Sequence, residues 1–379
     1  MSDKRIICAG HVCIDITPAV PGSGGERIEE ILTPGKLIQV GRASLSVGGC
    51  VSNTGLGLKV LGADVSLMGK IGNDAFGELI LNQFRRYGAE EGLIVQDGDA
   101  SSYTVVIAIP GIDRIFLHHS GANDTFCDGD IPWEKVKGAA LFHFGYPPIM
   151  RSFYEREGEE LMKMLSHARE AGCATSLDLA AVDPDSDAGK VNWKEIITRT
   201  MSLVDFFCPS IEELCGMLDA ERFASWKERA GGRDVTTVLD VDRDIRPLAA
   251  QCMDLGCKVL LLKCGAPGMY LKTADRETLE KISPAAGLDS ALWADQDFFE
   301  RSYVPEKVLS GTGAGDTSIA AFLKAVLDGY DPQMAMHLAA GTGASCVEAY
   351  DTLSGLRSFD ELKEKIRGGW AKVSGSSAK

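Results

Sequence analysis

Short apolar runs alternate with longer amphipathic stretches along most of the 379-residue chain. Continuous apolar runs of this length are typical of strands buried on both faces of a parallel sheet, and the stretches between them have helical periodicity. The alternation predicts an α/β fold, a three-layer, doubly wound, mostly parallel sheet whose ligands bind at the carboxyl ends of the strands. Strands are predicted at Arg5–Ala9, Val65–Lys70, Ala140–Phe144, Ala174–Leu179, Leu203–Cys208 and Lys258–Lys263. Helices are predicted at Ser52–Leu61, Phe76–Tyr87, Glu155–Ala171, Ile211–Leu218, Ile245–Leu255, Asp316–Leu327 and Pro332–Ala349.

Two segments depart from this alternation. Residues 16–47 are rich in glycine and proline and carry few helical signals. Residues 102–120 hold two β-type runs, Tyr103–Ile109 and Arg114–His119, around Pro110-Gly111-Ile112-Asp113, which predicts a hairpin. We expect the two segments to form one small β lid inserted into the main domain.

The remainder of the chain predicts a single domain. The main domain is expected to span residues 1–372, and residues 373–379 to form a disordered tail. The segment 283–309, which contains Trp293, Phe298 and Phe299, is interpreted as an additional long loop or excursion.

The composition of the chain restricts which binding partners and which cellular location are expected. The net charge is -15 and no run of Lys and Arg occurs, which argues against a nucleic-acid partner. No stretch is apolar over the ~18 residues that a membrane helix needs, so no membrane partner is expected. The eleven cysteines are an odd number without a CxxC pair, which favours a reducing, cytoplasmic location over a disulfide framework or zinc site.

The strongest chemical signal is the run Ser310-Gly311-Thr312-Gly313-Ala314-Gly315-Asp316-Thr317, which leads into an amphipathic helix. Glycines let successive backbone N–H groups point at one ligand, and the positive end of a helix dipole favours an anion such as phosphate. Asp316 could accept a proton from an attacking hydroxyl. Alternatively, Asp316 only caps the helix and the glycines only form a loop.

Two further motifs have both a functional and a structural interpretation. Gly48-Gly49 precedes a predicted helix that carries Asn53, whose amide can hydrogen-bond hydroxyls, although the segment taken alone favours a helix-entry loop. Asp15 follows the first predicted strand and could bind vicinal hydroxyls, or could be a solvated turn residue.

Taken together, these motifs resemble those of the PfkB (ribokinase-like) family of carbohydrate kinases. Ser46–Gly77 resembles the N-terminal signature of that family, and Gly313–Asp316 resembles its C-terminal signature. The resemblance implies an ATP- and Mg²⁺-dependent kinase that phosphorylates a hydroxyl of a sugar or sugar derivative. A nucleoside kinase of the same fold and a non-catalytic sugar-sensing homologue are the alternatives, and intact Gly313–Asp316 argues against the second. A Rossmann dehydrogenase is disfavoured because no GxGxxG follows Arg5–Ala9.

The resemblance also implies roles for individual residues. Asp316 is expected to be the catalytic base, beside an anion hole of Gly313, Ala314 and Gly315. The residues expected to bind substrate are Asp15, Gly48, Gly49 and Asn53. Those expected to bind the nucleotide are Ser210, Glu213, Lys263, Gly265, Gly268, Gly341 and Ser345, with Glu213 also organising magnesium through water.

Departures from the family pattern bear on the ligands. Ser210 replaces an Asn of the family's Asn-x-x-Glu segment, and Ser310-Gly311-Thr312 replaces its common Asp-Thr-Thr, so a monovalent cation is left open. Ribose is disfavoured, because Cys13, Cys50 and Gly145 stand where ribokinases hold the sugar with Asn, Lys and Glu. Asp178-Leu179-Ala180 also departs from the strand end of ketodeoxygluconate kinases.

Two smaller expectations concern the lid. Lids of this family often pair between subunits, and the apolar run Tyr103–Ile109 therefore predicts a homodimer through the lid. The histidines outside the motifs are interpreted as structural, but His118 and His119 alternate faces on a lid strand, so one of them could reach the substrate.

Overall fold

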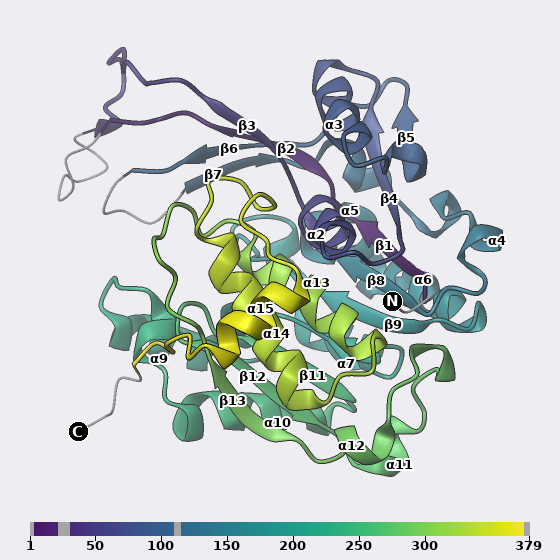
Figure 1. The fold of residues 1–379 in the computed structure, drawn as a ribbon. Helices are drawn as coiled ribbons and strands as arrows, with labels where there is room; N and C mark the ends of the chain where they lie inside the picture. The colour runs from purple at the N-terminus through teal and green to yellow at the C-terminus, as the bar shows by residue number, and fades with distance from the viewer. Residues whose placement is uncertain (1–3, 22–30, 110–114, 375–379) are drawn as a thin grey trace.

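The computed structural model describes residues 4–21, 31–109 and 115–374, which form a large and a small β-sheet with helices around the large one (Figure 1). The large sheet has nine strands in the order β13-β12-β11-β10-β9-β8-β1-β4-β5. Strands β5, β4, β1, β8, β9, β10 and β11 run parallel, and β12 and β13 continue the sheet in antiparallel pairing. The strands are β1 (Ile6–Gly10), β4 (Val65–Gly72), β5 (Leu93–Gln96), β8 (Leu141–Gly145), β9 (Ala174–Asp178), β10 (Phe206–Phe207), β11 (Val259–Lys263), β12 (Gly268–Thr273) and β13 (Asp297–Arg301).

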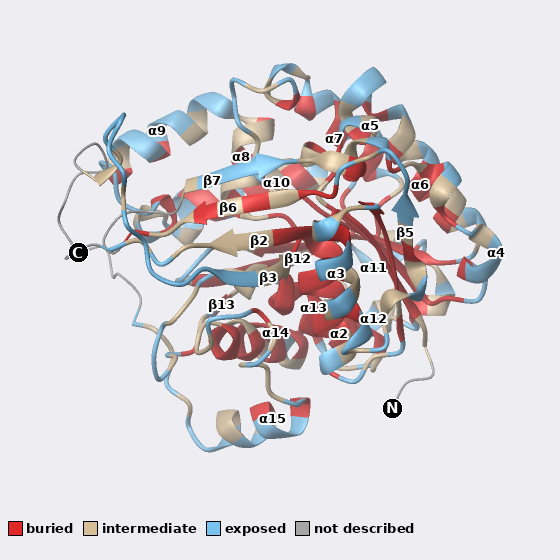
Figure 2. Ribbon diagram, turned by 90° about the horizontal axis from the view of Figure 1, so that it is seen from above, coloured by how far each residue is buried: buried red, intermediate tan, exposed pale blue. Residues whose placement is uncertain are grey.

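Helices cover both faces of this sheet, which confirms the predicted three layers. Neighbouring residues of β1 point into opposite cores: Ile6 and Cys8 pack with α13 and α14, whereas Ile7 and Ala9 pack with α6 and α8. In Figure 2, α13 and α14 are drawn mostly in the red of buried residues. The helices are α2 (Gly57–Val60), α3 (Ala75–Arg85), α4 (Trp133–Val136), α5 (Arg151–Tyr154), α6 (Glu159–Glu170), α7 (Trp193–Met201), α8 (Ile211–Leu218), α9 (Ala220–Ala230), α10 (Arg246–Asp254), α11 (Arg276–Leu279), α12 (Ser290–Trp293), α13 (Ala314–Leu327), α14 (Pro332–Cys346) and α15 (Phe359–Arg367), and a π-helix, η1 (Val51–Leu56), precedes α2.

The interpretation of residues 283–309 as a long loop was wrong. Part of the segment 283–309 is a strand of the main sheet, because Asp297–Arg301 forms β13 and pairs with β12. This strand lies at the edge of the sheet and carries charged residues at positions 297, 300 and 301, so it lacks the continuous apolar run of the central strands.

The small sheet contains strands from both segments that were predicted to form the lid. Its strands are β2 (Cys13–Thr17), β3 (Ser44–Gly48), β6 (Tyr103–Ile107) and β7 (Ile115–His119), in the order β3-β2-β6-β7. The predicted hairpin is β6 and β7, which pair antiparallel; its turn at residues 110–113 lies outside the described residues. Because β2 starts three residues after the end of β1, the small sheet stands directly on the carboxyl end of the large one (Figure 1).

The C-terminal end of the described chain lies against the main domain. The backbone N–H of Val373 donates to the carbonyl of Ser302 at 2.9 Å, and residues 375–379, most of the predicted tail, lie outside the described residues. Among the helices of residues 4–374 that the structure describes, none is both long and apolar enough to cross a membrane.

Candidate active site

The loop before α13 ends at a glycine that no other residue could replace without strain. Gly313 has φ +77°, and a Cβ atom at this position would lie only 2.2 Å from Cγ2 of Thr352. Helix α13 then starts at Ala314, and the N–H groups of a first helical turn have no acceptor within the helix. The start of α13 therefore has the properties of an anion-binding site.

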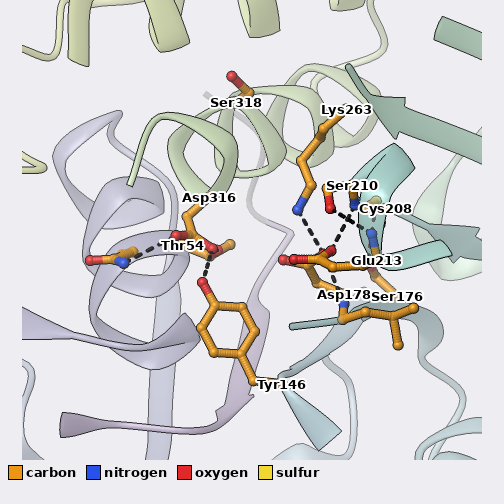
Figure 3. A network of polar contacts seen from close by, with 12 residues as sticks. Thr54, Tyr146, Ser176, Asp178, Cys208, Ser210, Glu213, Lys263, Asp316 and Ser318 are labelled. Carbon is orange, nitrogen blue, oxygen red and sulfur yellow. Dashed lines mark hydrogen bonds and ion pairs between the residues drawn. The ribbon is translucent and has the colours of Figure 1, made fainter. Parts of the chain in front are cut away.

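Asp316 lies in this first turn, and its carboxylate is held by side chains from other segments (Figure 3). The hydroxyl of Tyr146 donates to its Oδ1 at 2.5 Å, and Nδ2 of Asn53 donates to its Oδ2 at 3.0 Å. The hydroxyl of Thr54 lies 3.5 Å from Oδ1. Gly313, rather than Asp316, occupies the N-cap position of α13. The alternative interpretation, in which Asp316 only caps this helix, therefore does not apply.

The surroundings of Asp316 favour proton uptake. Its side chain is buried, and this burial raises the pKa of the carboxyl. The charge of Lys263 and the hydrogen bonds from Tyr146 and Asn53 lower the pKa but do not outweigh burial. A carboxylate with a raised pKa is a stronger proton acceptor than an exposed one.

Tyr146 is a residue of this site that the sequence did not reveal. It follows β8 directly and adopts φ +76°, a region that non-glycine residues rarely occupy. Strained backbone of this kind is found where the surrounding structure fixes it, often beside ligands. The available signal was a polar aromatic residue at the carboxyl end of a predicted parallel strand.

A second group of charged side chains lies beside Asp316, at the ends of β9 and β11 (Figure 3). Nζ of Lys263 lies 2.7 Å from Oδ1 of Asp178, whose other oxygen is buried and has no hydrogen-bond partner among the described residues. Burial raises the pKa of Asp178 to about 8; Lys263 opposes this rise, whereas the charges of Glu213 and Asp316 add to it. Asp178, which was not among the predicted site residues, thus belongs to a cluster with more acids than bases.

Glu213 and Ser210 form the start of α8. The N–H of Ser210 donates to Oε2 of Glu213 at 2.8 Å, and the N–H of Glu213 donates to the hydroxyl of Ser210 at 3.2 Å. This reciprocal capping explains the local fold: Ser replaces the family's Asn at a position where both residue types cap helices well. It also fixes the Glu213 carboxylate near Lys263 and Asp178.

A pocket of about 340 Å³ brings the predicted residues of both sheets together. Predicted residues that line it are Asp15, Gly49, Asn53, Glu213, Gly313 and Asp316. The other lining residues are His11, Cys13, Thr104, Phe116, His118, Tyr146, Ile149, Gly311 and Thr312. Of the two lid histidines, His118 lines the pocket, and its Nδ1 lies 3.0 Å from the hydroxyl of Thr104.

Asp15 lies on β2, and Gly48 of the neighbouring strand β3 leaves space for its side chain. A Cβ atom at Gly48 would lie 2.3 Å from Oδ2 of Asp15, so Gly48 does not line the pocket but leaves space for this carboxylate. Burial raises the pKa of Asp15 to about 6, although hydrogen bonds from Cys13 and Thr104 oppose the rise.

His11 is a second pocket residue that the sequence did not single out. It lies in the two-residue link between β1 and β2, and its ring centroid is 5.1 Å from that of His118 and 6.0 Å from that of Tyr146. Burial lowers its pKa well below the usual value, so the ring is neutral, and its Nδ1 has no hydrogen-bond partner among the described residues. Gly49, with φ +86°, accommodates this ring, because a Cβ atom there would lie 2.6 Å from Nδ1.

The remaining predicted residues lie outside this pocket. Ala314 and Gly315 lie between the lining residues Gly313 and Asp316, and the Lys263 side chain passes 3.3 Å from where a Cβ atom of Gly315 would be. Ser210 is hydrogen-bonded to the lining residue Glu213. Gly265 and Gly268 flank the turn between β11 and β12, and Gly341 packs against Leu362 and Trp370. Ser345 is buried on α14. Nucleotide contacts of these residues stay predictions.

Comparisons with known proteins agree with this architecture. The structure of a putative ribokinase II from E. coli in complex with ATP and Mg²⁺ matches this fold with a TM-score of 0.68 at 17% identity, covering 96% of this chain and 99% of that one. The fold is therefore that of ribokinases.

Sequence comparison then gives the family. The model of the pfkB family carbohydrate kinases matches residues 3–358, and the chain belongs to this family of sugar kinases. An uncharacterized sugar kinase from Archaeoglobus fulgidus is 25% identical over 306 residues, which is 80% of this chain and 100% of that protein. A 5-dehydro-2-deoxygluconokinase from Clostridium perfringens is 24% identical over 372 residues, covering 96% of this chain and 92% of the relative.

Proposed function

We propose that this sugar kinase transfers the γ-phosphoryl group of ATP to a hydroxyl of a neutral or basic sugar derivative, with Asp316 as the base. The observation that carries this proposal is the buried carboxylate of Asp316, which lies in the first turn of α13 and lines the same pocket as Asp15. One carboxylate can thus take the proton while the other holds further hydroxyls of the acceptor.

The mechanism follows from how each group is held. Tyr146 and Asn53 donate to the two oxygens of Asp316 and fix the direction of its remaining lone pairs. The acceptor hydroxyl loses its proton to Asp316 as its oxygen bonds to the γ-phosphorus and the bond to the β-phosphate oxygen breaks. The free N–H groups at the start of α13 stabilise the charge on the transferred group.

The charged residues in and beside the pocket are of the types that bind magnesium as well as a nucleotide. The unpartnered Oδ2 of Asp178 and the carboxylate of Glu213 are hard oxygen ligands, which Mg²⁺ prefers, either directly or through water. When bound with ATP, Mg²⁺ neutralises phosphate charge. Lys263, which lies between Asp178 and the start of α13, supplies a further positive charge. The E. coli neighbour in complex with ATP and Mg²⁺ supports this part of the proposal.

The charge of the pocket supports a substrate that is not an acid. Its lining includes the carboxylates of Asp15, Glu213 and Asp316, and among the residues that the structure describes no Lys or Arg lines it. A sugar acid would place its own carboxylate among like charges, which is unfavourable in a partly desolvated site. The rings of His11, His118 and Tyr146 offer apolar surface to the carbon face of a sugar.

The proposed preference for substrates that are not acids is tested by a coupled ADP-release assay on acceptors that differ in one functional group. Glucose, glucosamine and glucuronate form one such set, and further sets come from ketoses, deoxy sugars and polyols. Among the sets that are turned over, we expect kcat/KM of the acid to be at least ~10-fold below that of its neutral or amino counterpart, because one repulsive contact of ~1.4 kcal/mol has this effect. A preference for the acids would contradict the proposed substrate charge while leaving the kinase activity itself established.

Nucleosides belong in the same assay as a second candidate acceptor. The aromatic rings in the pocket, His11, Phe116, His118 and Tyr146, could also stack on a nucleobase. Turnover of adenosine, inosine or cytidine above that of every sugar would favour this alternative.

We also predict that two copies of the chain form a homodimer through the lid. Leu45 on β3 and Leu117 on β7 are 47% and 54% exposed, and these strands form the two edges of the small sheet. Exposed apolar side chains on edge strands favour pairing with a second copy. We expect light scattering at micromolar concentration to give the mass of two chains, and Leu45→Lys with Leu117→Lys to give the mass of one. A monomeric wild-type protein would contradict the prediction.

A cytoplasmic location fits this chemistry. All eleven cysteines are free thiols in the structure, which supports a reducing compartment, and ATP is the proposed phosphoryl donor.

A further inference from the structure

Two cysteines and a histidine from three separate segments meet in the core beneath the sugar pocket. Sγ of Cys8 on β1 lies 3.9 Å from Sγ of Cys50, which directly precedes η1. His143 on β8 completes the group, and one ligand atom from each residue lies within 4.8 Å of the other two. All three side chains are buried, with exposed fractions of 0%.

His143 presents an unused nitrogen in this core. Its Nδ1 lies 2.9 Å from the hydroxyl of Ser176, whereas Nε2 is buried and has no hydrogen-bond partner among the described residues. A buried nitrogen without a partner is costly in a protein interior. Metal-binding histidines commonly use one ring nitrogen for the ion and the other for a hydrogen bond of this kind.

The spacing of these atoms is close to that of a metal site. Ligands bound at ~2.3 Å for thiolate sulfur and ~2.0–2.1 Å for imidazole nitrogen stand roughly 3.5–4 Å apart around one ion. The two sulfurs already have this separation, and the imidazole would need to move by less than ~1 Å. We propose that Cys8, Cys50 and His143 bind one thiophilic d¹⁰ ion, Zn²⁺ or Cu⁺, beneath the sugar pocket.

The chemistry of the ligands sets which ions can bind. Thiolate and imidazole together select Zn²⁺ and Cu⁺ over Mg²⁺ or Ca²⁺, which prefer oxygen. Binding forms two metal–sulfur bonds and one metal–nitrogen bond, and each thiol releases its proton to solvent. The site is thus chemically separate from the Mg²⁺ that would accompany ATP.

The position of the site connects it to the pocket. Cys50 follows Gly49, a lining residue, and His143 precedes the lining residue Tyr146 by three positions. A Cβ atom at Gly145 would lie 2.3 Å from Sγ of Cys50, so the sulfur is in contact with the backbone that carries Tyr146. A bound ion would therefore tie β1, β8 and the residue that precedes η1 together, next to the backbone of the lining residues Gly49 and Tyr146.

The test is metal titration of the purified full-length protein under reducing, phosphate-free conditions. Zn²⁺ and Cu⁺ are added in separate arms, each against a chelator of known affinity, and Cd²⁺ reports thiolate coordination through its ultraviolet charge-transfer band. We expect saturation at one ion per chain and a Tm that rises until this ratio is reached. The two arms give the affinity of the site for each ion separately.

Variants separate this site from unspecific thiol binding. The double variant Cys8→Ser, Cys50→Ser keeps nine of the eleven cysteines, and His143→Gln keeps all of them. Each removes one or two of the three ligands and is expected to weaken binding by more than the ~10–100-fold that loss of an outer-shell partner alone typically costs. The control Cys173→Ser changes a buried cysteine whose Sγ contacts the carbonyl of Val136 and should bind as wild type does.

Each outcome decides the question. Stoichiometric binding that His143→Gln abolishes, with Cys173→Ser unchanged, supports the site. Absence of one-to-one binding in the folded wild-type protein, or equal binding by the His143→Gln variant, overturns it. If the double cysteine variant does not fold, His143→Gln and its Cd²⁺ spectrum still give the answer.

Discussion

Replacing Asp316 by Asn is expected to lower kcat by ~10²–10⁴-fold, the usual contribution of a general base. Asn has nearly the same shape, but it cannot accept the proton of the attacking hydroxyl. Because burial raises the pKa of Asp316, the wild-type kcat should also fall as pH decreases through that pKa, since only the ionised carboxylate acts as a base. The measurements are kcat against pH, the affinity for ATP and the Tm.

A matched control makes the same chemical change at a helix start outside the pocket. Asp74 caps α3, where its Oδ1 accepts from the N–H of Gly77 at 2.7 Å. Asn caps helices about as well as Asp, so Asp74→Asn should leave kcat near that of wild type. A near-normal kcat of Asp316→Asn, with both variants folded, would remove Asp316 as the base.

Asp15→Asn is expected to raise KM for the sugar ~10- to 100-fold, because a charge-assisted hydrogen bond typically contributes ~1.5–3 kcal/mol. The affinity for ATP should change little, since Asp15 lies on β2 of the small sheet, across the pocket from α13. The pKa of Asp15 is raised to about 6, so the wild-type KM for sugar should rise as pH falls through this value. The Asn variant should lack this pH dependence.

Steady-state kinetics with each substrate varied in turn separate the two affinities. Asp97→Asn, an exposed change whose carboxylate accepts from Asn73, is the control and should behave as wild type does. A large loss of ATP affinity with normal sugar affinity in Asp15→Asn would place Asp15 in the nucleotide site instead.

The central sheet could be predicted from the sequence because its strands are buried on both faces. Runs such as Ile6–Ala9 and Val259–Leu262 are continuously apolar, and each became a strand of the large sheet. The edge strand β13 was not predicted because Asp297, Glu300 and Arg301 interrupt its apolar pattern. The predicted helix at Ser52–Leu61 begins as the π-helix η1, a backbone variant that side-chain periodicity does not specify.

Part of the candidate site could be predicted because some of its residues lie in or near recognisable local motifs. Glycine-rich motifs mark places where backbone approaches a ligand, and these motifs indicated Asp316 and Asn53, whereas Asp15 was indicated by its position after the first predicted strand. Tyr146 and Asp178 stand at the ends of strands in segments without such a motif. Their proximity to Asp316 depends on the strand order β9-β8-β1, which is a property of the whole sheet rather than of any local pattern.

In the proposed reaction, the placement of two carboxylates on different parts of the fold would discriminate against water as an acceptor. Asp15 belongs to the small sheet, whereas Asp316 belongs to a helix packed on the large one, and both line one pocket. A sugar has several hydroxyls and can contact the two carboxylates simultaneously, so its own size aligns the reacting oxygen. In the proposed reaction, a water molecule would contact only one of the two carboxylates at a time. The length of the acceptor, rather than its chemical reactivity, would then protect ATP from futile hydrolysis.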